Sequence, residues 1–211
     1  MAKAIAGELG FIHIDSGAMY RALTWLALQE GVGAGDEEGL SRLAKSAEIR
    51  FRHVEPRDGR QLVYCRGQNV TDDIRNLQVS QTVSAVAALP GVREAMVEAQ
   101  KQLAAGRDVV MDGRDIGTVV LPEAECKIFL TASVEERAKR RWREREGQGQ
   151  ALEEIVEELR KRDDEDTNRK ASPLRQAEGS VLLDTTPMSF QEAVEETLRL
   201  VRESGANREK R

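Results

Sequence analysis

Residues 11–29 read FIHIDSGAMYRALTWLALQ, and this stretch decides the fold class. Residues 11–14 form a short apolar run after Gly10, which predicts a buried strand. The Asp-Ser-Gly at 15–17 supplies a helix cap and a turn, and residues 18–29 predict a helix. A strand, a tight turn and a helix in direct succession are typical of α/β proteins.

The same alternation returns in the second half of the chain. Strands are predicted at 109–111, 127–130 and 181–183, and helices at 135–146, 152–162 and 189–203, with a further helix at 2–9. This order predicts a mainly parallel sheet with helices on both faces, which binds ligands at the carboxyl ends of its strands. Those ends carry Asp15, Asp112, Thr131 and Asp184. We expect them to line one crevice, although loops after strands are commonly polar in any case.

The segment between the two halves has a different character. Residues 49–54 and 61–65 have β-type composition and flank a turn signal at 56–59, so they predict an antiparallel hairpin. Residues 71–88 and 92–105 predict helices separated by a Pro-Gly break. We therefore expect an inserted subdomain within a chain of 211 residues that suits a single domain.

Composition argues against two classes of partner. The net charge is −5, the isoelectric point is about 5.3 and aromatic residues make up 4% of the chain. An acidic chain with few aromatic rings is a poor match for nucleic acid or for an anionic membrane. No apolar run approaches the roughly 18 residues of a membrane span, and no charged-then-apolar leader opens the chain, so we expect a cytoplasmic protein.

The cysteines and histidines suggest structural roles. Cys65 and Cys126 match no metal-ligand spacing, and each lies in an apolar run, so we expect both in the core. His13 lies inside a predicted strand and His53 inside the hairpin. Neither stands at a spacing that indicates a catalytic triad or a metal site, and we expect both to be structural.

Three stretches could carry chemistry. DGRDIGT at 112–118 places two carboxylates and an arginine after a strand, where they could hold Mg²⁺ and a phosphate, although Asp and Gly also form ordinary turns. DSGAMYR at 15–21 opens a helix whose amino end attracts anions, or is a plain cap. The arginine-rich segments 135–146 and 160–170 suit phosphate contact by a mobile lid, or a solvated helical hairpin.

Together these motifs resemble the bacterial cytidylate kinases, the (d)CMP kinase family. The matching stretches are HIDSGAMYRA at 13–22, SAVAALPGVREA at 84–95, DGRDIGTVVLPEA at 112–124, KIFLTASVEERAKRR at 127–141 and RDDEDTNRKASPL at 162–174. They follow one another in the family's order through nearly the whole chain. The resemblance implies a P-loop NTPase-like three-layer fold in one domain, 1–211. Within it we expect a monophosphate-binding insert at 31–92 that contains the hairpin, and a helical lid at 133–170.

The resemblance also implies a reaction and its residues. The γ-phosphate of ATP, with Mg²⁺, would pass to CMP or dCMP, and the protein would need no partner subunit, nucleic acid or membrane. The positions that look like the family's acceptor contacts are Ser16, Arg21, Ser84, Arg93, Arg114, Asp115, Arg162 and Asp166. The arginines similar to those that close over the phosphates are Arg137, Arg141 and Arg169, and Asp112 looks like the acidic residue near Mg²⁺. Replacing Arg114 or Asp115 by Ala is expected to reduce turnover while leaving the fold intact.

One element of the family pattern is missing from the printed sequence. Family members begin with a strand and a GxxxxGK[ST] loop that wraps the ATP phosphates. None of the 211 residues forms such a stretch, and the opening MAKAIA resembles the helix that follows it. We therefore expect a sheet that lacks its first strand and exposes apolar edges. Three explanations stay open: a longer reading frame that encodes a working kinase, a monophosphate binder that has lost catalysis, or an unstable fragment.

Overall fold

The computed structural model describes residues 1–53, 61–144 and 150–205 of the chain. Helix α1 (Ala2–Leu9) ends at Gly10, whose positive φ of 69° allows the next amide, that of Phe11, to bond back to the Ala6 carbonyl. Strand β1 (Ile12–Asp15) therefore begins one residue later than predicted. It pairs in parallel with β5 (Val109–Asp112). Both strands confirm the predicted alternation.

Helix α2 (Ser16–Gln29) is the centre of the core. The Asp15 carboxylate accepts a hydrogen bond of 2.9 Å from the Ala18 amide, which fixes the amino end of the helix as predicted. Met19 and Leu23 are fully buried. A helix buried on nearly all sides needs elements around it, and α2 lies against helices and strands of the middle segment.

The middle segment contains the expected antiparallel strands, β2 (Arg50–His53) and β3 (Gln61–Cys65), with a short β4 (Gln68–Asn69) beside them. The predicted turn at 56–59 lies outside the described residues. The predicted helix at 71–88 is a 3₁₀ turn followed by α4 (Leu77–Ala88), because the Asn76 side chain caps a new helix at Val79. Helix α5 (Pro90–Ala104) has Pro at its first position, so this proline starts the helix.

Helix α3 (Glu37–Ser46) was not predicted from the sequence. It follows a glycine-rich stretch, and it buries only a narrow stripe that includes Leu40 and Leu43. The Asp36 side chain caps it through a 2.9 Å bond from the Gly39 amide. The Asp36 cap and the narrow apolar stripe together indicate a helix, although the stripe alone is a weak pattern. Helix α3 packs against α5.

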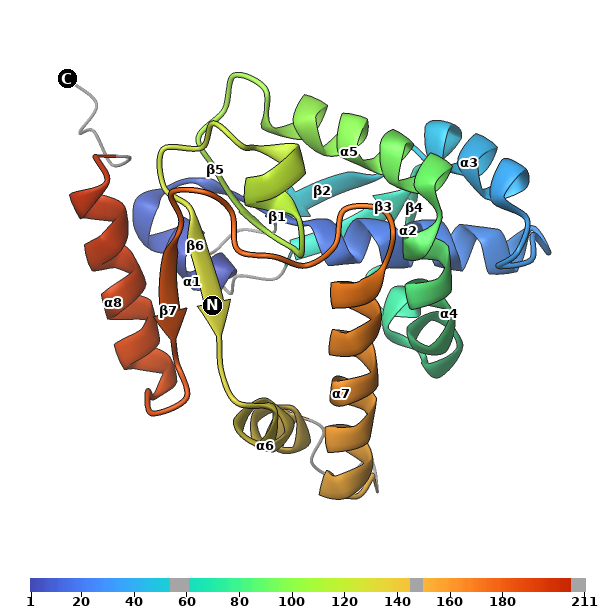
Figure 1. Ribbon diagram of the computed structural model, residues 1–211. Helices are drawn as coiled ribbons and strands as arrows, with labels where there is room; N and C mark the ends of the chain where they lie inside the picture. The colour runs from blue at the N-terminus through green and yellow to red at the C-terminus, as the bar shows by residue number, and fades with distance from the viewer. Residues whose placement is uncertain (54–60, 145–149, 206–211) are drawn as a thin grey trace.

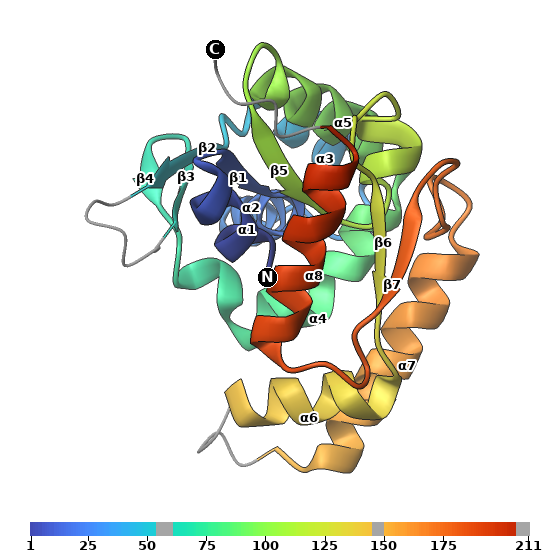
Figure 2. The ribbon, with the colours of Figure 1, turned by 90° about the vertical axis from the view of Figure 1, so that its left-hand side faces the viewer.

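The second half of the chain builds the remaining layer. Strands β6 (Ile128–Thr131) and β7 (Val181–Asp184) pair in parallel, and α8 (Phe190–Glu203) follows β7 with Ser189 as its predicted cap. Helices α6 (Val134–Glu144) and α7 (Leu152–Asn168) form the α6–α7 hairpin that leaves the body between the two strands. Figure 1 shows this hairpin below the body, and Figure 2 shows α8 beside α1.

Helix α7 runs six residues beyond the predicted end at 162. Its last part, 163–168, is DDEDTN and has no apolar periodicity, so the pattern ended too early. Polar contacts stabilise this last part of the helix, among them a 2.7 Å hydrogen bond from the side-chain amide of Asn168 to the Asp164 carboxylate. The two cysteines also differ from each other: Cys65 is buried as expected, whereas Cys126 is only half-buried.

The fold is therefore a mixed α/β fold with parallel strands, but its parallel strands do not form one sheet. In the described residues β1 pairs with β5 and β6 pairs with β7, and no ladder joins the two pairs. Apolar side chains remain exposed on these strands, including Ile12, Leu130 and Leu182. The sequence predicted a mainly parallel sheet that lacks its first strand. The parallel strands are confirmed and lie in two separate pairs, and apolar groups are exposed on them as expected.

Candidate functional site

Two acidic residues stand side by side where the first pair of strands ends. Asp15 and Asp112 are register partners at the carboxyl ends of β1 and β5. The Asp112 side chain is 52% exposed, and its Oδ1 atom lies 2.6 Å from Nε2 of the buried His13. Thr131 and Asp184 form a corresponding pair at the ends of β6 and β7. The four polar residues at the strand ends therefore form two separate pairs.

The loop after β5 is packed closely against the start of α2. The Ser16 hydroxyl donates a 2.7 Å hydrogen bond to the Asp112 carbonyl. A Cβ atom at Gly113 would lie only 2.2 Å from that hydroxyl oxygen, so glycine is required here by the close approach. This contact fixes the direction in which the following residues, Arg114 and Asp115, leave the strand.

A buried ion pair lies beyond this loop. The guanidinium of Arg93, on α5, donates to the Asp115 carboxylate, and both side chains are about 5% exposed or less. Arg93 also donates to the Ala87 carbonyl at 2.9 Å, and its guanidinium carbon lies 5.4 Å from the centre of the Tyr20 ring. Burial raises the pKa of Tyr20 to about 12, against the opposing effect of Arg93. The two opposite charges of this buried pair balance each other.

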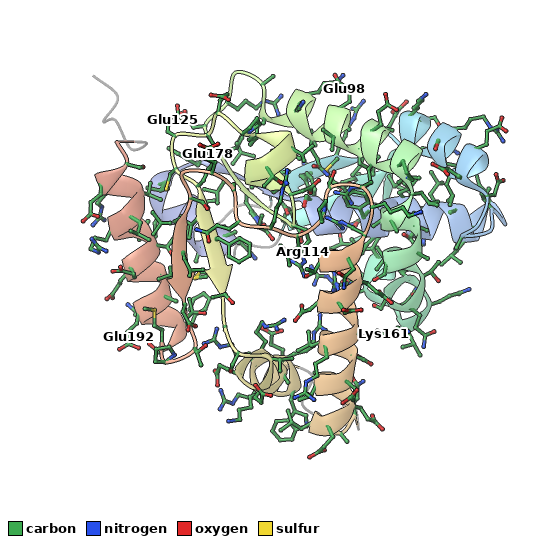
Figure 3. The ribbon with its side chains drawn as sticks, in the orientation of Figure 1. Glu98, Arg114, Glu125, Lys161, Glu178 and Glu192 are labelled. Atoms are coloured by element: carbon green, nitrogen blue, oxygen red, sulfur yellow. The ribbon has the colours of Figure 1, made fainter. Side chains whose placement is uncertain are left out.

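A second ion-pair cluster continues from the first. Asp166, near the end of α7, accepts hydrogen bonds from Arg114 at 2.7 Å and from Arg169 at 3.3 Å. Arg169 is nearly buried and also donates to the Ser172 carbonyl at 2.8 Å. Burial lowers the pKa of Arg169, and the nearby Arg93 charge lowers it further. Figure 3 shows Arg114 above the carboxyl-terminal end of α7, which is where this cluster joins the hairpin to the body.

Arg21, Arg141 and Arg162 belong with Arg114 to a group of four arginines whose charges act on one another. Burial lowers the pKa of Arg21 to about 10, and the positive charges of Arg162 and Arg141 lower it further. Burial also lowers the pKa of Arg162, with Arg114 as the next cause. Arg21 itself donates to the Ser80 hydroxyl at 3.0 Å. We call Arg21, Arg114, Arg141 and Arg162 the arginine cluster; positive charge concentrated in this way attracts phosphate oxygens.

Ser84 lies between these groups on α4. It follows Ser80, which contacts Arg21, by four residues, and precedes Ala87, which contacts Arg93, by three. Residues spaced by four lie on one helix face, so Ser84 lies on the same face of α4 as Ser80, whose hydroxyl accepts from Arg21. Its side chain is half-buried.

Arg137 is placed differently from the other predicted residues. Its guanidinium forms two hydrogen bonds to Asp163 of α7, at 3.1 and 2.6 Å, and a third to the Ala132 carbonyl at 3.0 Å. These contacts join α6 to α7 within the hairpin. The structure thus brings together the predicted acceptor residues, together with Arg141 and Arg169, but it holds Arg137 on a carboxylate of its own hairpin.

Sequence reasoning did not assign three residues that the site uses. Tyr20 packs under Arg93, although it lies inside the DSGAMYR stretch that drew attention to the site. Asp163 holds Arg137, and it belongs to the RDDEDTNR stretch. His13 was expected to be structural, and it orients the Asp112 carboxylate. Position in a recognised motif was the only signal available for the first two.

The donor set for a metal ion is small. Within the described ranges no group of three or more His, Cys, Asp or Glu side chains could hold an ion. The half-exposed Asp112 and its neighbour Asp15 supply two carboxylates at one edge. Mg²⁺ is commonly bound by one or two carboxylates with the remaining ligands from substrate phosphates and water, and this set fits that mode. Among the same residues no helix is both long and apolar enough to cross a membrane.

An α/β body with carboxylates at strand ends and a cluster of arginines beside them is typical of proteins that bind phosphorylated ligands. A family model described as cytidylate kinase matches residues 1–203 of the chain. The cytidylate kinase of Caldanaerobacter subterraneus subsp. tengcongensis is 46% identical over 206 residues, which cover 97% of this chain and 89% of that protein. Those of Bacillus licheniformis and Geobacillus sp. are 49% identical over 203 residues (95% and 89%) and 48% identical over 205 residues (96% and 90%). The chain belongs to the cytidylate kinase family.

Proposed function

We propose that the protein transfers the γ-phosphate of ATP to CMP or dCMP, giving CDP or dCDP, as a monomeric cytoplasmic enzyme of pyrimidine nucleotide metabolism. The observation that carries the proposal is the arginine cluster beside the buried Arg93–Asp115 pair. One end of this region has balanced charge and suits a neutral base. The other end has concentrated positive charge and suits a monophosphate.

The acceptor nucleotide would lie along these two ends. Ser84, Arg93 and Asp115 would contact the pyrimidine edge, because an amide-like base needs both donors and acceptors at fixed positions. Arg21, Arg114 and Arg162 would take the phosphate oxygens, with Asp166 and Ser16 completing the pocket. Asp166 already bridges Arg114 and Arg169, so it would keep both arginines aimed at the nucleotide.

Phosphoryl transfer requires alignment and charge neutralisation more than covalent help from the protein. In the proposed lid, residues 133–170, Arg137, Arg141 and Arg169 would close over the transferring phosphate and exclude water. Arg137 would first exchange its Asp163 partner for phosphate oxygens. The insert, 31–92, would hold the acceptor from the opposite side.

Mg²⁺ bound to ATP would neutralise the negative charge of the phosphate oxygens. Asp112, directly or through water, would hold the ion at the strand end, with His13 orienting the carboxylate. We further propose that the two parallel strand pairs are the two halves of the central sheet in a P-loop NTPase-like three-layer fold. A strand carrying GxxxxGK[ST] would lie between β5 and β6, and the printed residues contain no such stretch.

A second candidate function is that of a protein that binds CMP without phosphorylating it. A site without the loop would lose its main electrostatic support for the ATP phosphates. The two candidates share the acceptor pocket and differ only at the donor side. An in-frame glycine-rich stretch ending in Gly-Lys-Ser or Gly-Lys-Thr in the DNA upstream of the Met1 codon would favour the enzyme.

The test combines calorimetry with a coupled assay for ADP formation. The enzyme predicts CMP-dependent formation of ADP, and the binding protein predicts CMP binding with weak ATP binding and no turnover. Arg114→Ala should reduce kcat/KM, or CMP affinity in the non-catalytic case, by about a hundredfold, as for loss of a charged hydrogen-bond donor to phosphate. Lys161→Ala on the exposed face of α7 is the matched control. Absence of CMP binding by the wild-type chain would exclude both candidates.

A further inference from the structure

We propose that Arg140 is a positioning residue that fixes the α6–α7 hairpin to the body and thereby sets where Arg137 and Arg141 point. The catalytic consequence rests on the proposed function, whereas the anchoring itself does not. Arg140 has no place in the acceptor site, and it lies on the part of α6 that faces the strand ends. Its contacts are of a kind that holds segments together.

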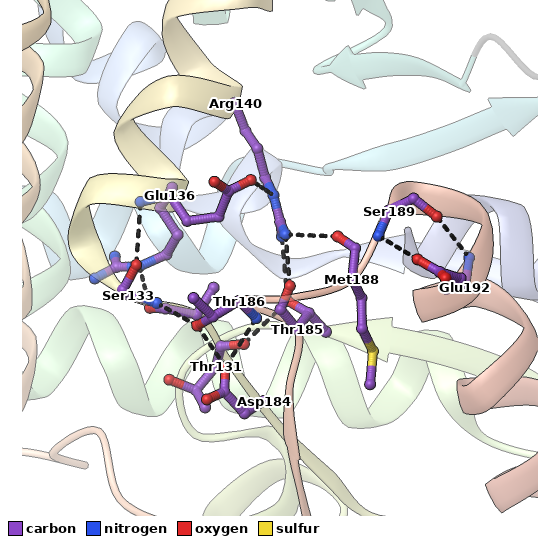
Figure 4. A network of polar contacts seen from close by, with 12 residues as sticks. Thr131, Ser133, Glu136, Arg140, Asp184, Thr185, Thr186, Met188, Ser189 and Glu192 are labelled. Atoms are coloured by element: carbon purple, nitrogen blue, oxygen red, sulfur yellow. Dashed lines mark hydrogen bonds and ion pairs between the residues drawn. The ribbon is translucent and has the colours of Figure 1, made fainter.

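The guanidinium of Arg140 joins two segments that are distant in the sequence, α6 and the connection between β7 and α8. Its Nε atom donates to Glu136 at 2.9 Å, one turn earlier on α6. One terminal nitrogen donates to the Thr185 hydroxyl at 3.1 Å, and the other donates to the carbonyl oxygens of Thr185 at 2.6 Å and Met188 at 3.1 Å. Figure 4 shows Arg140 reaching from α6 into the connection between β7 and α8. All three nitrogens of the fork are therefore engaged.

The segment that Arg140 binds is itself tied to the start of α6. The Thr185 amide and hydroxyl donate to the Thr131 carbonyl at 2.9 and 3.0 Å. The Ser133 amide donates to the Thr186 hydroxyl at 2.9 Å, and that hydroxyl is bonded to Asp184 at 2.6 Å. The connections that follow β6 and β7 thus form one polar network, also drawn in Figure 4. Arg140 extends this network by two turns along α6.

An anchor at this position controls rotation of α6. Arg137 and Arg141 are four residues apart and lie on one face of the helix, and Arg140 lies next to Arg141 in the chain. Fixing Arg140 on the β7–α8 connection leaves α6 little freedom to turn about its axis. Arg141 is held close enough to Arg21 to lower the pKa of Arg21. Without the anchor, the arginine cluster would lose the contribution of α6.

The geometry requires arginine. A planar guanidinium can donate along three directions at once, to a carboxylate and to two backbone carbonyls. The ammonium of lysine is a point charge on a flexible stem and cannot keep the same three partners in place. Three of the four acceptors are neutral oxygens, which suits a structural anchor better than a group that awaits an anionic ligand.

The decisive measurement is hydrogen exchange of the backbone amides of α6, in wild type, Arg140→Met and Arg140→Lys. Lys139→Met removes an exposed cation from the neighbouring position and is the control. We expect exchange across 134–144 to become about tenfold faster in Arg140→Met, since a local opening loses a charged hydrogen-bond set. The exchange rates in Arg140→Lys should be close to those in Arg140→Met, and the exchange rates in Lys139→Met should be close to those of the wild type. Equal exchange in Arg140→Met and Lys139→Met would overturn the proposal.

The products of turnover provide a second measurement, the ratio of ADP to CDP, which a loss of stability alone would not change. A loosened hairpin admits water, so the ratio of ADP formed to CDP formed should rise above one in Arg140→Met and stay at one in Lys139→Met. An unchanged ratio, with kcat also unchanged, would refute the positioning role. Should Arg140→Met fail to fold, Thr185→Val removes the acceptor hydroxyl and should show a smaller change in the same direction. If the wild type shows no turnover, the proposed enzyme fails while the exchange experiment still decides the anchor.

Discussion

Replacing Arg21 by Met should leave the unliganded protein as stable as wild type, or more stable, while removing its response to CMP. Burial, with the charges of Arg162 and Arg141, lowers the pKa of Arg21 to about 10. That fall corresponds to about 3 kcal/mol of cost to the folded state, which we reduce to about 1–3 kcal/mol because water reaches part of the side chain. A base with a lowered folded pKa carries this cost at every pH below that folded pKa. The cost is lost as the pH rises from there towards the ordinary pKa of the group.

The interactions that Arg21→Met removes stabilise the fold by less than the burial of the charge costs. Arg21 donates hydrogen bonds to Ser80 at 3.0 Å and to the Ile74 carbonyl at 3.5 Å, together worth about 1 kcal/mol in this partly exposed position. The methionine stem retains most of the apolar packing. The net expectation for Arg21→Met is a change in unfolding free energy between about zero and 2 kcal/mol of stabilisation.

Urea denaturation at pH 7.5, with and without CMP, measures both parts of this prediction. CMP at about 100 times its dissociation constant should add about 2.7 kcal/mol to the wild type and nothing measurable to Arg21→Met. Arg42→Met is the control, because Arg42 forms an exposed pair with Glu38 on α3 and its loss should change stability by less than about 0.5 kcal/mol. If Arg21→Met is destabilised by more than 1 kcal/mol and still gains stability from CMP, the reading of the arginine cluster is wrong.

Two further predictions follow from buried groups. Asp115→Asn leaves the Arg93 guanidinium buried without its carboxylate and should cost about 3–5 kcal/mol in urea denaturation, part of which the double variant with Arg93→Met should recover; a cost under 1 kcal/mol would contradict the burial argument. Burial raises the pKa of the Cys65 thiol to about 11, so a disulfide reagent at pH 8 should modify Cys126 and leave Cys65 unreacted until the protein is unfolded. Rapid reaction of both cysteine thiols in the native protein would contradict the prediction that Cys65 is protected.

The elements with a strong local signal were predicted well. Helix α1, strand β5 and helix α8 agree with the sequence to within one residue, because each has an apolar pattern with a clear cap or turn at its end. Helix α3 was missed since its apolar stripe is narrow. The end of α7 was placed too early since it is held by side-chain contacts rather than by apolar spacing.

Pairing of the strands lies beyond such signals. The apolar runs predicted that β1, β5, β6 and β7 exist and are parallel, and the structure confirms both points. Which strand lies beside which depends on contacts between distant parts of the chain, and a local pattern carries no information on them. The division into two separate pairs could therefore not be predicted from the apolar runs alone.

The same limit applies to the site. The DGRDIGT stretch indicated that Asp112, Arg114 and Asp115 matter, but it could not assign their partners. In the structure Arg114 meets Asp166, 52 residues later, whereas Asp115 turns inward to Arg93. The expectation that Asp115→Ala leaves the fold intact does not follow once its partner is a buried guanidinium, because that charge would remain without a counter-ion. The expectation for the more exposed Arg114 is unaffected.

The two ends of the site differ in how their charges are balanced. A pyrimidine base is neutral at pH 7, so residues that read it can be neutralised in advance, as Arg93 and Asp115 are. A monophosphate carries nearly two negative charges, and arginines already paired with carboxylates would attract it weakly. In the proposed function Arg21 therefore supplies much of the attraction, because its own hydrogen bonds go to the neutral Ser80 hydroxyl and Ile74 carbonyl, and burial lowers its pKa. A bound phosphate would, in the same proposal, offset part of the free-energy cost of burying this cation, and this would favour binding of the nucleotide.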